Sequence, residues 1–175
     1  MNTIMKKIFI TLILLISLLC SKNASAANAT PKNFGSPIET NTYEEPDGSI
    51  VTEKIYFVSN SNNNFQFSRS GTKSGWFKKE KTHTWGSGTV MKYYAQGYFT
   101  WGNGKATVTK GSGKVSNVPS SVKISHKSLK TGTGKYAGVF NKYAYVTFSF
   151  TATNPIGLST DFSSTIRISQ SGNNI

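Results

Sequence analysis

Apolar and polar residues alternate with a period of two through most of the chain after residue 50. The alternation is clearest from Val90 to Trp101, where one face is apolar and the other carries polar and aromatic side chains. The first face holds Met91, Tyr93, Ala95, Gly97, Phe99 and Trp101, and the second holds Lys92, Tyr94, Gln96, Tyr98 and Thr100. A period of two predicts a β-strand with one face in the core and one face in solvent.

Other segments after residue 50 show the same alternation, and none shows the period of an amphipathic helix. These segments are Ile50 to Val58, Phe65 to Arg69, Lys105 to Lys110, Val122 to Lys127, Tyr143 to Ala152 and Ile166 to Ile168. Asn103-Gly104 suits the positive φ angles of a tight hairpin turn, and the polar run Ser59 to Asn64 predicts a second turn. The predicted fold is all-β. It is a single antiparallel β-sandwich of about seven to eight strands over residues 50–175, with a small β-barrel as the alternative.

The first 26 residues have the three parts of a secretory signal peptide. Lys6 and Lys7 form a basic start, the run Ile8 to Cys20 is apolar, and Ala24-Ser25-Ala26 provides a cleavage site. A membrane anchor is disfavoured because the apolar run is shorter than the roughly 20 residues that span a bilayer. Lipidation of Cys20 is disfavoured because a leucine, not a small residue, precedes it. We therefore expect a signal helix that is cleaved after Ala26.

Cys20 is the single cysteine of the chain and would leave with the leader. The exported protein would then contain no thiol, no disulfide and no cysteine-based metal site. The predicted location is extracellular, with the protein released or held at the cell surface by non-covalent contacts.

Charge divides the chain into two parts. The whole sequence has 20 Lys+Arg and 7 Asp+Glu, a formal net charge of +13. Residues 27–53 hold one base and five acids (net −4), whereas residues 54–175 hold 16 bases and two acids (net +14). Pro31, Pro37 and Pro46 also lie in the acidic part, so residues 27–49 are predicted to form an extended arm rather than a folded element. The arm is either an ordinary tail or a segment that docks on the basic body.

Two stretches of the chain resemble a type of small exported protein. The first is Tyr98 to Ala106, with the sequence YFTWGNGKA, and the second runs from Val146-Thr147-Phe148-Ser149-Phe150 through Asn154 to Ser159 and on to Ile166-Arg167-Ile168-Ser169. Together they resemble the small, largely uncharacterised, β-rich secreted proteins of Gram-positive bacteria. The resemblance covers roughly the last half of the chain. It implies a secreted all-β domain and carries no assigned activity.

Groups able to catalyse acid–base or nucleophilic chemistry are scarce in the predicted domain. They comprise His83, His126, Glu80 and Asp161. His126 alternates with Val122 and Ile124, which predicts a buried structural histidine, whereas His83 lies among bases and is expected at the surface. The paired carboxylates of a glycosidase would have to be Glu80 and Asp161, or would have to include a residue of the acidic arm. The sequence therefore favours a non-catalytic protein.

Metal and nucleotide motifs are also missing from the sequence. Glu44-Glu45-Pro46-Asp47-Gly48 lacks the alternating oxygen ligands of a calcium loop. The pairs Gly104-Lys105, Gly113-Lys114 and Gly134-Lys135 are not followed by the Ser or Thr that a phosphate-binding loop requires. No cofactor and no metal site are predicted.

Lysines and aromatic residues interleave along the basic part of the chain. The candidate binding residues are Trp76, Lys78, Lys79, Lys81, Lys92, Tyr94 and Tyr98. Such a surface attracts anionic polymers or an anionic membrane surface, while its rings can stack on sugars. Nucleic acid is chemically compatible but less favoured. Lysines that only keep an all-β protein soluble and protect its edge strands are the alternative.

Three functional hypotheses follow from these features. The first is a secreted, non-catalytic binding module for an anionic cell-envelope or extracellular polymer. The second is a cationic membrane-active toxin or bacteriocin-like protein, and the third is a hydrolase with an unrecognised site.

Overall fold

The computed structural model describes residues 30–31, 33–59, 71–136 and 139–175, with the backbone alone for 136 and 139–142. This part of the chain contains no helix and is built from β-strands. The strands are β1 (Glu39–Glu44), β2 (Ile50–Ser59), β3 (Lys73–Thr84), β4 (Val90–Gly102), β5 (Lys105–Ser116), β6 (Lys123–Tyr136), β7 (Val139–Thr153) and β8 (Ser159–Ser169). The predicted signal helix, the strand Phe65 to Arg69 and most of the turn before it lie outside the described residues.

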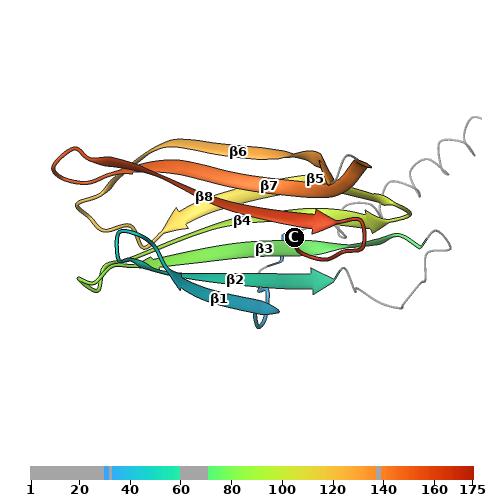
Figure 1. The fold of residues 1–175 in the computed structure, drawn as a ribbon, viewed down its shortest axis with the longest axis horizontal. Coiled ribbons are helices and arrows are strands. Elements are labelled where there is room, and N and C mark those ends of the chain that lie inside the picture. The colour runs from blue at the N-terminus through green and yellow to red at the C-terminus, as the bar shows by residue number, and fades with distance from the viewer. Residues whose placement is uncertain (1–29, 32, 60–70, 137–138) are drawn as a thin grey trace, which may run out of the picture. The chain divides into compact units, whose positions relative to one another are not determined.

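The strands form two antiparallel sheets that face each other (Figure 1). Sheet A has five strands in the order β1-β2-β3-β4-β5, and sheet B has three strands in the order β6-β7-β8. Each strand pairs with its neighbour in sequence, apart from β5 and β6, which belong to different sheets. Contacts between the sheets run from β3, β4 and β5 to strands of sheet B. The predicted all-β sandwich is therefore confirmed, and the barrel alternative is wrong because the sheets do not close.

The core fills the space between the sheets with the alternating apolar residues of the strands. On sheet A they include Ile55, Phe77, Met91, Tyr93, Ala95, Phe99, Trp101 and Ala106, and on sheet B Ala144, Val146, Phe148, Phe150, Ala152, Ile166 and Ile168. The inward set predicted from Val90 to Trp101 is confirmed. Burial of these side chains is the main favourable term that holds the sheets together.

Glycines on the inner face of sheet A let β4 and β5 approach sheet B closely. A Cβ atom added at Gly97 would lie 2.6 Å from a methyl group of Val146, and one added at Gly111 would lie 2.7 Å from a methyl group of Thr131. A Cβ atom at Gly113 would overlap the ring of Phe148. Small residues are therefore required where the two layers touch along β5.

The turn between β4 and β5 follows the prediction from Asn103-Gly104. Both residues have positive φ angles, 51° at Asn103 and 72° at Gly104. The two-residue loop joins Gly102 directly to Lys105, as expected for a tight hairpin.

The start of the domain differs from the prediction. Residues Glu39–Glu44 form strand β1, which pairs with β2 at the edge of sheet A, so the expectation of an arm without folded elements is wrong for these residues. Every side chain of β1 is exposed, so no apolar face marks the strand in the sequence. Backbone pairing stabilises β1, which is short and polar, as edge strands commonly are.

Candidate binding surface

The outer face of sheet A gathers lysines and aromatic rings from four adjacent strands. The register of β2 to β5 places opposite one another the residues that point away from the core. This face carries Lys54, Lys78, Lys92, Lys110 and Lys114 together with Tyr56, Trp76, Tyr94 and Tyr98. Glu80 is the single carboxylate on this face of β2 to β5. The face therefore has a marked excess of positive charge.

The structure divides the seven residues that the sequence grouped as a binding site. Trp76, Lys78, Lys92, Tyr94 and Tyr98 share the outer face of sheet A. Lys79 and Lys81 point to the opposite face, where Lys79 stands beside Ile55 and Ala95. The division follows from strand geometry, because consecutive residues of a strand point to opposite faces of the sheet.

Lys79 and Lys81 share the carboxylate of Glu53, a residue of β2, on the inner face. Their ammonium groups lie 2.7 and 2.8 Å from the two carboxylate oxygens of Glu53, and the Tyr43 hydroxyl donates to the same carboxylate at 3.2 Å. Burial opposes the ionised form of Glu53, but hydrogen bonds from Lys79 and Lys81 outweigh it and lower the pKa of Glu53. These two lysines therefore hold sheet A together and are poorly placed to bind an external anion.

Lys78 is surrounded by groups of the protein itself. Its ammonium nitrogen lies 4.7 Å from the ring centre of Tyr94, 5.2 Å from that of Tyr56 and 5.9 Å from that of Phe34. It also donates to Glu80 at 2.7 Å. Lys78 is thus engaged by cation–π contacts and by an ion pair with Glu80, the single carboxylate on this face of β2 to β5.

Trp76 and Tyr98 are buried although they belong to the outer face. Their exposed fractions are 4% and 6%, and their rings meet edge-on with centroids 5.8 Å apart. The hydroxyls of Tyr98 and Ser74 are 2.7 Å apart. These two rings therefore contribute to the packing of sheet A. Among the predicted binding residues, the half-buried Lys92 and Tyr94 are more accessible to a ligand.

Lys110 and Lys114 of β5 complete the accessible part of this face, and sequence reasoning did not include them. Both are exposed, with Lys110 opposite Tyr98 and Lys114 opposite Tyr94. The apolar alternation of β5 stops at Val108 because glycines occupy the next inward positions. The alternation of Lys110, Ser112 and Lys114 with glycines is the sequence pattern that could have predicted that the strand continues beyond Lys110.

His83 is buried, which overturns the expectation that it lies at the surface. Its side chain is 2% exposed and packs against the rings of Trp85, Tyr93 and Phe162. Its Nε2 atom lies 2.9 Å from the Tyr93 hydroxyl, and burial lowers the pKa of His83. The lysines near His83 in the sequence suggested that this segment faces solvent. In the structure, however, His83 lies on the inward face of β3 together with Phe77, Lys79 and Lys81.

His126 is exposed, which overturns the expectation of a buried structural histidine. The register between β6 and β7 shifts between Ser125 and Ser128, and His126 has a φ angle of 49°. This β-bulge breaks the alternation begun by Val122 and Ile124 and turns the His126 side chain outward.

The two carboxylates considered for hydrolysis lie far apart in the fold. Glu80 is on the outer face of sheet A, whereas Asp161 is on the outer face of sheet B and accepts a hydrogen bond from Thr151 at 2.6 Å. Both sheets separate these groups, so they cannot act on one substrate as a pair. Within the described residues, no group of three or more His, Cys, Asp or Glu side chains is arranged to hold a metal ion.

Comparison with protein-family models, with curated proteins and with solved structures gives no match to this chain. No helix in the described segments is long and apolar enough to cross a membrane.

Proposed function

We propose that the protein is a secreted, non-catalytic binding module whose outer face on sheet A binds an anionic polymer of the cell envelope or the extracellular space. One observation carries the proposal: Lys92 and Lys114 flank Tyr94, Lys110 lies opposite Tyr98, and the single carboxylate on this face of β2 to β5 is engaged by Lys78. On this face of β2 to β5, positive charge therefore exceeds negative charge around Tyr94 and Tyr98.

The spacing of the lysines suits a chain of repeating negative charges. Lys92 lies opposite Ser116 and is therefore a diagonal neighbour of Lys114, about 7–8 Å away, and Lys110 lies four residues from Lys114 on β5, about 13 Å away. A polymer with a phosphate or carboxylate on each repeat unit can meet several of these lysines at once. Each contact contributes no more than about 1 kcal/mol at an exposed site, so the affinity comes from their number and falls with salt. The half-buried ring of Tyr94 offers a stacking surface for a sugar unit.

The first test is a pull-down on purified Gram-positive cell walls with and without their teichoic acid. The proposal predicts that the protein binds intact walls, that removal of teichoic acid abolishes most of the binding, and that high salt releases the protein. Binding that survives removal of the anionic polymer would contradict the proposal.

A parallel assay separates the membrane-active alternative. Leakage of anionic vesicles at protein concentrations that give no wall binding would favour a membrane-active toxin. Wall binding without leakage supports the binding module.

Export is part of the proposal and has its own test. We expect cleavage after Ala26, so mass spectrometry of the culture supernatant should find an N-terminus at Ala27. An uncleaved or lipidated form retained by the cells would contradict the secreted location.

A further inference from the structure

A cavity of about 320 Å³ opens at one end of the sandwich, and none of the lysines discussed above lines it. The β3–β4 and β7–β8 hairpins lie at this end of the two sheets (Figure 1). The lining comes from both sheets and three connections: Trp85, Ser87, Thr89, Met91, Pro119, Val122, Ala152, Asn154, Leu158, Thr160 and Phe162. The volume is at the lower end of the range of small-molecule sites, about 300–1,000 Å³.

Hydrogen bonds fix the turns that form the cavity walls. In the β3–β4 hairpin the Trp85 N–H donates to the Thr89 carbonyl at 3.0 Å. In the β7–β8 hairpin the side-chain oxygen of Asn154 accepts from the N–H groups of Ile156 and Leu158 at 3.1 and 2.9 Å. A ligand would thus enter a site that already exists, with little ordering cost.

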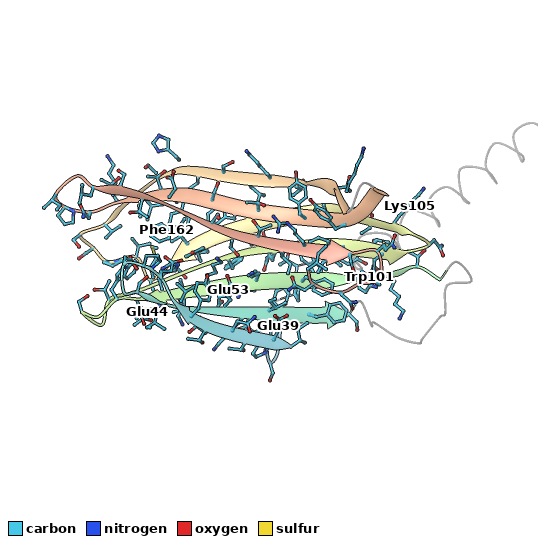
Figure 2. The ribbon with its side chains drawn as sticks, in the orientation of Figure 1. Glu39, Glu44, Glu53, Trp101, Lys105 and Phe162 are labelled. Atoms are coloured by element: carbon cyan, nitrogen blue, oxygen red, sulfur yellow. The ribbon has the colours of Figure 1, made fainter. Side chains whose placement is uncertain are left out.

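The chemistry of the cavity walls indicates an apolar ligand that carries an uncharged polar group at one end. Met91, Ala152 and Phe162 belong to the core or pack against it, so the inner wall is apolar; Figure 2 shows Phe162 between the two sheets. Hydroxyl and amide groups lie among the lining residues, and none of them is charged. Charged residues near the cavity include Lys123 and Asp161, which lie on the outer face of sheet B and have opposite signs, and Asp47, whose carboxylate accepts a hydrogen bond from the lining residue Trp85.

Two large apolar side chains are exposed on the β7–β8 hairpin. Ile156 is 79% exposed and Leu158, which lines the cavity, is 64% exposed. Exposed aliphatic residues beside a half-open apolar cavity extend its apolar surface, and a bound chain would cover part of this surface.

We propose that this cavity binds the alkyl tail of a single-chain amphiphile with an uncharged, hydrogen-bonding head group. The tail would contact Met91, Phe162 and Leu158, and the head would meet the hydroxyl and amide groups of the rim. The site is distinct from the lysine face of sheet A and does not depend on polymer binding.

The probe is a series of n-alkyl β-D-glucosides with tails of six to nine carbons, studied by calorimetry below the micelle concentration. Affinity should rise about fourfold for each added methylene until the tail fills the cavity, which corresponds to about 0.8 kcal/mol per buried CH₂. An affinity that does not depend on tail length would overturn the proposal.

Thr160→Trp is the blocking variant, because Thr160 is exposed on β8 and lines the cavity opposite Ala152. Ser163→Trp is the matched control, because Ser163 is exposed on the outer face of the same strand. Thr160→Trp should weaken octyl glucoside binding at least tenfold, and Ser163→Trp should leave it unchanged. If Thr160→Trp does not fold, Ser87→Trp in the exposed β3–β4 turn serves the same purpose.

Two outcomes would contradict the proposed site. Octyl glucoside binding that persists in the folded blocking variant would place the ligand elsewhere. Binding to phosphatidylcholine vesicles without binding to monomeric glucosides would show instead that Ile156 and Leu158 insert into membranes.

Discussion

The Nε2 atom of His83 lies 2.9 Å from the hydroxyl of Tyr93, and both side chains are buried in the core of the sandwich. Burial lowers the pKa of His83 and raises that of Tyr93. The charges of Glu45 and Asp47 favour protonation of His83, and that of Lys81 opposes it, but desolvation outweighs them. The pair therefore favours a neutral imidazole in the folded protein.

This pair gives folding stability a defined dependence on pH. Because the pKa of His83 is lowered on folding, the unfolded chain binds more protons below about pH 6.5. The free energy of unfolding should thus be constant above that pH and decrease as the pH falls toward the folded pKa. Urea unfolding between pH 7.5 and 5 measures this slope. His83→Gln should flatten it, whereas the exposed His126→Gln should keep it; equal slopes in the two variants would contradict the assignment.

Glu53 is the acidic residue on which the inner face of sheet A depends most. Glu53→Gln would leave Lys79 and Lys81 without their carboxylate partner, in positions where about four-fifths of each side chain is covered. We expect a loss of about 2 kcal/mol in the free energy of unfolding at pH 7. Glu39→Gln on the exposed edge strand is the control and should cost less than about 0.5 kcal/mol. Comparable losses in the two variants would show that the ion pairs contribute nothing.

The stabilisation from Glu53 should also depend on pH. Its pKa is lowered on folding, so the contribution is present above its unfolded pKa and is lost as the pH falls through the folded pKa. The difference in stability between the wild type and Glu53→Gln should therefore shrink in acid.

Gly113 tests the close packing of β5 against sheet B. Gly113→Ala would place a methyl group against the ring of Phe148, so we expect a loss of about 2 kcal/mol or more by thermal or urea unfolding. Gly86→Ala is the control, since no atom lies within 4 Å of the added Cβ and its φ angle is not positive. A stable Gly113→Ala protein would show that the sheets are less tightly apposed than described.

A strand can be predicted from the sequence when the side chains that it buries are apolar. Strand β4 is predictable because its inner residues are apolar and its outer residues are mostly polar. Strand β3 was missed because Lys79 and Lys81 occupy inward positions, where both pair with Glu53 from a distant part of the chain. Sequence alone cannot supply that partner.

The candidate site was predicted in part for the same reason. Lys92 and Tyr94 were found because their strand alternates clearly, and Lys79 was grouped with Lys78 because they are adjacent in the sequence. The two histidines were assigned the wrong way round. The bulge at His126 and the inward run to His83 become visible only when strand pairing is known.

The segment before β1 is expected to cover part of the lysine face of sheet A, and its removal tests this. Phe34 lies over the ammonium group of Lys78, on the face proposed to bind the polymer. Removing residues 27–36 should expose Lys78 and raise the affinity for teichoic acid roughly twofold to fivefold at low ionic strength, with less effect at high salt. Phe34→Ala in the full chain should reproduce part of this gain. Unchanged affinity in both folded variants would show that the segment does not mask the site.

A longer deletion is unsuitable for this purpose. Removing residues 27–53 would delete β1, the first residues of β2 and Glu53 (Figure 2), and we expect it to unfold the domain. The acidic segment is therefore in large part a structural element of sheet A.

The proposed function is tested most directly by the affinity of two triple variants for purified teichoic acid, measured over a range of salt concentrations. One variant replaces Lys92, Lys110 and Lys114 on sheet A by Gln, and the other replaces the exposed Lys123, Lys127 and Lys130 on β6 by Gln, so both lose the same charge. The account predicts that the first loses roughly tenfold to a hundredfold in affinity and most of its salt dependence, at about 0.5–1 kcal/mol per contact. The second should stay within about threefold of the wild type. Equal losses in the two folded variants would contradict the account, because the binding would then follow net charge and not the outer face of sheet A.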